Sequence, residues 1–195
     1  MEHDIKLSSD QGRFLIFEAR KTIHDNLLKQ PQQNESGGTS PHEVNPVLNR
    51  KGGTFVTLSK NGKLRGCIGH IIAHEPIIES IRHNALNAAF RDPRFPPVSV
   101  DELSDIHIEI SILTEPELVP YNDVDELKTK LRPGIDGVII QKENKNATFL
   151  PQVWKQLPDH KSFLSHLCIK AGLSPSAWEN EKITVFTYQV QSFEE

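Results

Sequence analysis

The segment LRGCIG at positions 64–69 holds the residues best suited to chemistry in this sequence. Side chains alternate between the two faces of a strand, so Arg65 and Cys67 are predicted to lie side by side if the segment is extended. A cation beside a thiol favours the thiolate, the form that attacks electrophiles and binds soft metals. Gly66 and Gly69 would then leave room for the close approach of a ligand.

The same segment also has a purely structural interpretation. In that interpretation Cys67 is a small buried apolar residue, and its flanking glycines permit tight backbone packing or a bulge. The residue types alone favour this second interpretation. A cysteine nucleophile also needs a positioned base, and the sequence gives no geometry for the candidates, which are His70, His74, His83 and His107.

Three further features are candidates for a site. Glu109 alternates with an isoleucine face, so it is either a solvated carboxylate or an ion-pair partner of Arg65. A rigid proline-rich segment holds Arg94 in a defined direction, although a stiff connector with a cation near a helix end is the preferred interpretation. His70 and His74 have the i,i+4 spacing of helical metal ligands, but the strand ends between them, so we expect them to diverge and predict no metal site.

The elements that must position these residues follow from periodicity and turn signals. The larger ones are a helix from about Asp10 to Lys29 behind a Ser8/Gln11 capping box, a hairpin of 54–58 and 64–72 around Asn61-Gly62, a helix between Pro76 and Asp92-Pro93, and a strand over 106–113. Residues 31–53 are predicted to form a long loop. A smaller lobe is predicted from a helix at 123–131, strands at 137–141 and 147–150, and helices near 153 and at 161–171. A final strand at 183–190 would return to the first sheet.

Composition excludes several classes of protein. The 195 residues, 36% hydrophobic and 25% charged, suit one compact body with a core. The net charge is −4 and the 22 basic residues are scattered, which disfavours nucleic-acid binding. No basic stretch precedes an apolar run and no span of about 20 apolar residues occurs, so secretion and membrane insertion are not expected. Two cysteines without CxxC spacing fit a reducing cytoplasm.

Five sequence blocks together resemble the AMMECR domain family. In chain order they are LRGCIG, AAFRDPRFPP at 88–97, EISILT at 109–114, TFLPQVW at 148–154 and KAGL at 170–173. The resemblance covers roughly Gln11 to Val190 and is greatest to the prokaryotic branch called AmmeMemoRadiSam system protein A. The 31–53 loop and the acidic tail carry no family signal.

The resemblance implies an α+β fold with two subdomains, each an antiparallel sheet with packed helices, and a cleft between them. The large subdomain is expected at 1–114 plus 179–195 and the small one at 115–178. LRGCIG side chains would face the cleft, so the expected binding residues are Leu64, Gly66, Ile68, Gly69, His70 and Arg94. The resemblance also implies association with a Memo-type protein and a radical S-adenosylmethionine protein.

The family's own activity is not established, so none is inherited. We predict that the protein binds a large substrate in the cleft and modifies it, with Cys67, Arg65 and Glu109 as the catalytic candidates. The alternative is a non-catalytic adaptor that docks a partner protein. The sequence leaves cofactors open.

Overall fold

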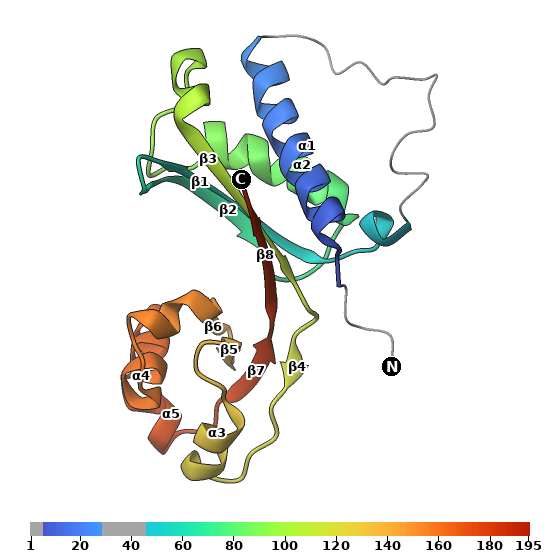
Figure 1. Ribbon diagram of the computed structural model, residues 1–195. Coiled ribbons are helices and arrows are strands. Elements are labelled where there is room, and N and C mark those ends of the chain that lie inside the picture. Colours follow the sequence, from blue (N-terminus) through green and yellow to red (C-terminus); the bar gives the residue numbers. More distant parts are fainter. Residues whose placement is uncertain (1–5, 29–45) are drawn as a thin grey trace. The chain divides into compact units, whose positions relative to one another are not determined.

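The computed structural model describes residues 6–28 and 46–195 and has the predicted α+β class (Figure 1). Its strands form two four-stranded antiparallel sheets, each with packed helices. The chain divides into two compact units, Met1–Glu115 with Gln191–Glu195 and Pro116–Val190, which are described separately below. None of the helices in the described ranges combines the length and apolar character needed to cross a membrane.

The sheet of the first unit has the strand order β2–β1–β3–β8. Its strands are β1 (Gly53–Lys60), β2 (Lys63–His70), β3 (Ile106–Leu113) and β8 (Val190–Glu194). The predicted hairpin is confirmed: β1 pairs antiparallel with β2, and Asn61 and Gly62 turn the chain with φ of 52° and 72°. Both residues tolerate the left-handed backbone that a tight hairpin turn requires. The LRGCIG segment therefore lies on β2, at an edge of the sheet.

Two long helices, α1 (Ser9–Leu27) and α2 (Ile77–Phe90), cover one face of this sheet (Figure 1). The Ser8/Gln11 capping box begins α1 as predicted, and Pro76 caps α2. Helix α2 packs on β1 and β2, whereas α1 packs on β3. The alternating isoleucines of β3 are buried beneath them: Ile106, Ile108, Ile110 and Ile112. Short 3-10 helices at Pro46–Asn49 (η1) and Val100–Asp105 (η2) complete the unit.

The sheet of the second unit has the order β4–β7–β5–β6. Its strands are β4 (Glu117–Leu118), β5 (Gly137–Lys142), β6 (Lys145–Phe149) and β7 (Thr184–Tyr188). Its helices are α3 (Val124–Lys130), η3 (Pro151–Lys155), α4 (His160–Lys170) and α5 (Ala177–Asn180). The core stacks Trp154 on Phe163 with ring centroids 3.7 Å apart, and Trp178 and Cys168 are also buried there.

The final strand differs from the prediction. Instead of one strand at 183–190 that returns to the first sheet, β7 pairs with β4 and β5 in the second sheet, and only β8 joins the first. Tyr188 explains why β7 stays, because its ring covers Gly137 and its hydroxyl hydrogen-bonds Thr148 at 2.9 Å. The second boundary between the units therefore follows Val190 rather than residue 178. Most of the predicted 31–53 loop lies outside the described residues.

Candidate functional site

Cys67 lies in a row of three side chains that crosses the sheet of the first unit. It is opposite Thr57 on β1, and Thr57 is opposite Glu109 on β3. Alternation places this row on the face away from α1 and α2, because the neighbouring residues Val56 and Ile110 are buried under the helices. The Thr57 hydroxyl donates a hydrogen bond to the Cys67 sulfur at 3.4 Å. Cys67 as a whole residue is half-buried, in contrast to the buried Cys168.

Arg65 does not follow the alternation that predicted it beside Cys67. The β1–β2 register shifts at this point, so that Gly66 is opposite Leu58 while Leu64 is opposite Ser59, and Arg65 is the extra residue of a β-bulge. A bulge redirects the side chain, which is why the expected pairing fails.

The buried guanidinium of Arg65 pairs with Glu102 of η2 rather than with Glu109. Its Nε and Nη2 donate to the two Glu102 oxygens at 3.2 and 3.0 Å. The hydrogen bond from Arg65 is the largest cause that lowers the pKa of Glu102 to about 2. Of the two alternatives for Glu109, the ion pair with Arg65 is therefore not formed, and Glu109 is a half-buried carboxylate at the end of the row.

Asp92 is the residue that sequence reasoning missed. Its buried carboxylate accepts hydrogen bonds from the Cys67 backbone N–H (2.9 Å) and from the backbone N–H, Nε and Nη2 of Arg94 (3.1, 2.9 and 2.6 Å). The Arg94 hydrogen bond is the main cause that holds the pKa of Asp92 far below its usual range. An aspartate directly after a helix and two residues before an arginine was the available signal, since Asp side chains bond nearby backbone N–H groups.

Arg94 is the cation that reaches Cys67. Its Nη2 donates to the Cys67 carbonyl at 3.1 Å, so Asp92 and Arg94 together satisfy both backbone groups of Cys67 that face outward from the edge strand. The pKa of Arg94 is raised, chiefly by its hydrogen bond to Asp92 and to a smaller degree by the Cys67 thiol. The guanidinium is half-exposed and also lies 5.5 Å from the Phe95 ring centroid. The proline-rich segment therefore does more than connect two elements.

The glycines of the segment serve packing rather than ligand access. A Cβ on Gly66 would lie 2.2 Å from the carbonyl oxygen of Ala88 on α2, and one on Gly69 would lie 2.3 Å from that of Thr54. The structural interpretation of the glycines is thus the one that the coordinates support. The absence of a side chain at Gly66 lets the backbone of α2 approach β2 closely.

The remaining predicted residues are divided between the two faces of β2. Leu64 is exposed, whereas Ile68 packs against the core and His70 lies on the helix-covered side, with Nε2 3.1 Å from the buried Ser80 hydroxyl. His70 and His74 do not diverge as expected, because the turn after β2 brings their ring centroids within 5.5 Å. In the described ranges no three His, Cys, Asp or Glu side chains are grouped so that they could hold a metal.

A family model described as AMMECR1 matches residues 16–193, and those bounds contain every residue of the site above. The chain belongs to the AMMECR1 family. Its AMMECR1 relatives include proteins from Methanothermobacter thermautotrophicus (37% identical, 97% of this chain and 96% of that protein) and Methanosarcina mazei (41% identical, 97% and 94%). The crystal structure of the uncharacterized protein PH0010 from Pyrococcus horikoshii is similar throughout, with 34% identity, a TM-score of 0.83 and coverage of 97% and 93%.

Proposed function

We propose that this AMMECR1 protein binds a large substrate on the open face of its first sheet and modifies it through Cys67. The observation that carries the proposal is the half-buried Cys67, whose sulfur accepts a hydrogen bond from the Thr57 hydroxyl at 3.4 Å and whose carbonyl accepts one from the Arg94 guanidinium at 3.1 Å. Arg94 takes the role that the sequence gave to Arg65.

The geometry suits a nucleophile that is fixed in place before the substrate arrives. Asp92 anchors Arg94 through three hydrogen bonds, and the Cys67 backbone is held at both its N–H and its carbonyl. Such preorganisation lowers the cost of aligning the sulfur with an electrophile. Glu109, two strands away in the same row, is the carboxylate placed to contact a substrate that lies along the row.

The partners and compartment that we propose are those implied by the family resemblance. A Memo-type protein and a radical S-adenosylmethionine protein would act with this chain in one modification pathway, in the cytoplasm. Both cysteines are unpaired, which fits a reducing compartment.

Alkylation of the native protein tests the reactive thiol. Attack of the thiolate on iodoacetamide forms an S–C bond and releases iodide, and mass spectrometry locates the product. We expect Cys67 to react and Cys168 to resist until unfolding, because Cys168 is buried and burial raises its pKa. A Cys67 that reacts only after the protein unfolds would eliminate the proposal.

A pair of reagents isolates the contribution of Arg94. Iodoacetate is anionic and iodoacetamide is neutral, so a cation beside the sulfur favours iodoacetate. In Arg94→Gln the ratio of the two rates should fall several-fold, and this ratio is insensitive to any change in exposure of Cys67. Arg13→Gln, which removes an exposed arginine of α1, is the matched control and should leave the ratio unchanged.

A non-catalytic adaptor is the second candidate, and the exposed Leu64 favours it. Leu64 is opposite Ser59 and 46% exposed, and apolar residues of this kind contribute to protein docking surfaces. If the protein is an adaptor, Cys67→Ser should retain binding to a purified Memo-type or radical S-adenosylmethionine partner, whereas Leu64→Asp should lose it. If Cys67 is a nucleophile, Cys67→Ser should lose the function in a complementation test.

A further inference from the structure

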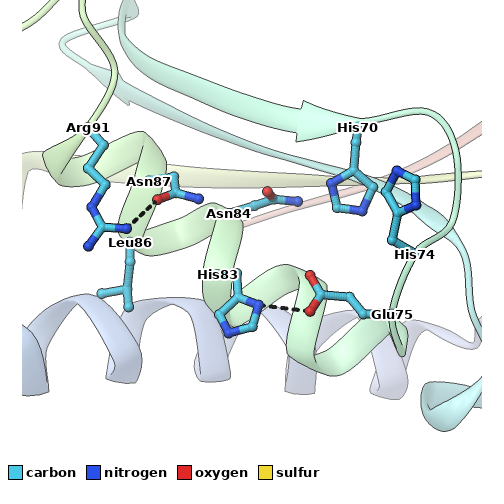
Figure 2. A pocket seen from close by; sticks show the side chains of 8 residues that line it. All are labelled: His70, His74, Glu75, His83, Asn84, Leu86, Asn87 and Arg91. Carbon is cyan, nitrogen blue, oxygen red and sulfur yellow. Dashed lines mark hydrogen bonds and ion pairs between the residues drawn. The ribbon is translucent and has the colours of Figure 1, made fainter.

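A pocket of about 440 Å³ lies between the end of β2 and helix α2 (Figure 2). The end of β2 and the loop after it contribute His70, His74 and Glu75, and α2 contributes His83, Asn84, Leu86 and Asn87. Positions 83 and 87 of α2 are four residues apart and share one face of the helix, and Arg91 follows directly after the helix ends at Phe90.

Buried hydrogen bonds fix the wall of this pocket. Asn84 Nδ2 donates to Thr54 Oγ1 at 2.9 Å and contacts Ser80 Oγ at 3.3 Å, and Ser80 in turn holds His70 Nε2 at 3.1 Å. Thr54, Ser80 and Asn84 are all more than nine-tenths buried. Among the described residues no group donates a hydrogen bond to Asn84 Oδ1, and Asn84 lines the pocket. Asn84 Oδ1 is therefore a fixed acceptor available to a ligand in the pocket.

Arg91 supplies the permanent positive charge. No carboxylate of the described part of the chain lies within ion-pair distance of it, and its Nη1 donates to Asn87 Oδ1 at 3.3 Å, which leaves the Asn87 amide hydrogens free to donate. Glu75, the only carboxylate in the lining, is engaged by His83 at 2.8 Å (Figure 2). The pKa of His70 is lowered, first by burial and then by His74, so its ring stays neutral near pH 7.

The charge of Arg91 offsets the partial negative charge at the C-terminal end of α2. Arg91 follows the last residue of α2, where the helix dipole places roughly half a negative charge and repels anions. The full positive charge of Arg91 outweighs that partial charge, and without it the same end of the pocket would exclude an anion.

We propose that this pocket binds a small hydroxylated anion, with its carboxylate or phosphate on Arg91 and Asn87 and a hydroxyl that donates to Asn84 Oδ1. Carboxylate and phosphate are both anions that accept hydrogen bonds, so Arg91 and Asn87 can donate to either group. This site lies on the opposite face of β2 from Cys67 and does not depend on the reactivity of that thiol.

Nuclear magnetic resonance titration of the full chain tests the site. The probes are glycerol 3-phosphate and glycerate, which differ in their anionic group, and glycerol is the neutral control. We expect saturable shifts of the amide signals from Asn84 to Arg91 with at least one anionic probe and none with glycerol. The probe that binds more tightly identifies the anionic group.

Matched variants complete the test. Arg91→Gln should weaken binding at least tenfold, and Asn84→Asp should weaken it by introducing a second negative charge, whereas Arg13→Gln should have no effect. Because Arg91 is exposed, its variant is expected to keep the wild-type melting temperature, which confirms that folding is intact. Absence of saturable shifts with both anionic probes, equal shifts with glycerol, or unchanged affinity in Arg91→Gln would each overturn the proposal.

Discussion

Removal of the Asp92 carboxylate should destabilise the first unit by about 3 kcal/mol. The carboxylate accepts four hydrogen bonds, two from backbone N–H groups and two from the Arg94 guanidinium. Removing one partner of a buried ion pair typically costs about 3–5 kcal/mol. The lower end applies here, because the Arg94 side chain is 53% exposed and is hydrated again once its partner has gone.

Two variants and one control separate the contributions. Asp92→Ala removes all four acceptor contacts, whereas Asp92→Asn keeps one oxygen that accepts the Cys67 N–H and should cost about 1.5 kcal/mol. Glu79→Gln breaks an exposed pair with Arg82 on α2 and should change stability by no more than about 0.5 kcal/mol. Urea unfolding gives the three values.

Hydrogen exchange gives a local measurement that does not assume two-state unfolding of a chain with two units. Asp92→Ala leaves the outward-facing N–H of Cys67 without its acceptor, so this amide should exchange faster than in the wild type. A loss of stability below about 1 kcal/mol, with unchanged exchange at Cys67, would refute the idea that Asp92 holds the strand.

The same carboxylate predicts a pH dependence with a definite sign. The pKa of Asp92 is lowered in the folded protein, first by the Arg94 hydrogen bond, so the unfolded state binds the proton more readily. The stabilisation is therefore fully present above the unfolded pKa of about 3.9 and is lost as the pH falls below it. The difference between wild type and Asp92→Ala should shrink between pH 6 and pH 3.

Three other substitutions have clear expected outcomes. Glu102→Gln leaves the buried Arg65 guanidinium without a counter-charge and should cost about 3 kcal/mol by urea unfolding at pH 7. That cost should diminish as the pH falls from about 4.3 toward the folded pKa of about 2. Gly66→Ala forces a methyl group against the Ala88 carbonyl and should lower stability by about 2 kcal/mol in thermal unfolding. Cys168→Ala opens a small void in the second core and should cost about 1 kcal/mol, measured by tryptophan fluorescence, without altering iodoacetamide labelling of the first unit.

Local signals in the sequence were sufficient for most elements of the first unit. The capping box of Ser8 and Gln11, the Asn61-Gly62 turn and the alternating isoleucines of β3 each depend on residues that are near one another in the chain. Helix caps, hairpin turns and strand alternation are local physical preferences, so they are visible without tertiary contacts.

The errors arose where one residue changes a pattern that is otherwise regular. A single bulge at Arg65 moved its guanidinium from the predicted neighbour Cys67 to Glu102, because strand alternation changes face with every residue. Glu102 also forms a capping box with Ser99 at the start of η2. The pairing of β7 likewise depends on contacts of Tyr188 with distant strands, which periodicity does not encode.

An open strand edge usually acts as a template onto which another chain can add, the first step of many aggregation reactions. On β2 the middle of that edge is already occupied, because the carboxylate of Asp92 and the guanidinium of Arg94 take the positions that the carbonyl and N–H of an incoming strand would fill. A second copy could extend the sheet through Cys67 only by displacing both side chains from their ion pair, in which Asp92 is buried and Arg94 half-exposed. The strand that carries the thiol is thereby protected from self-association at its edge, while its face remains accessible.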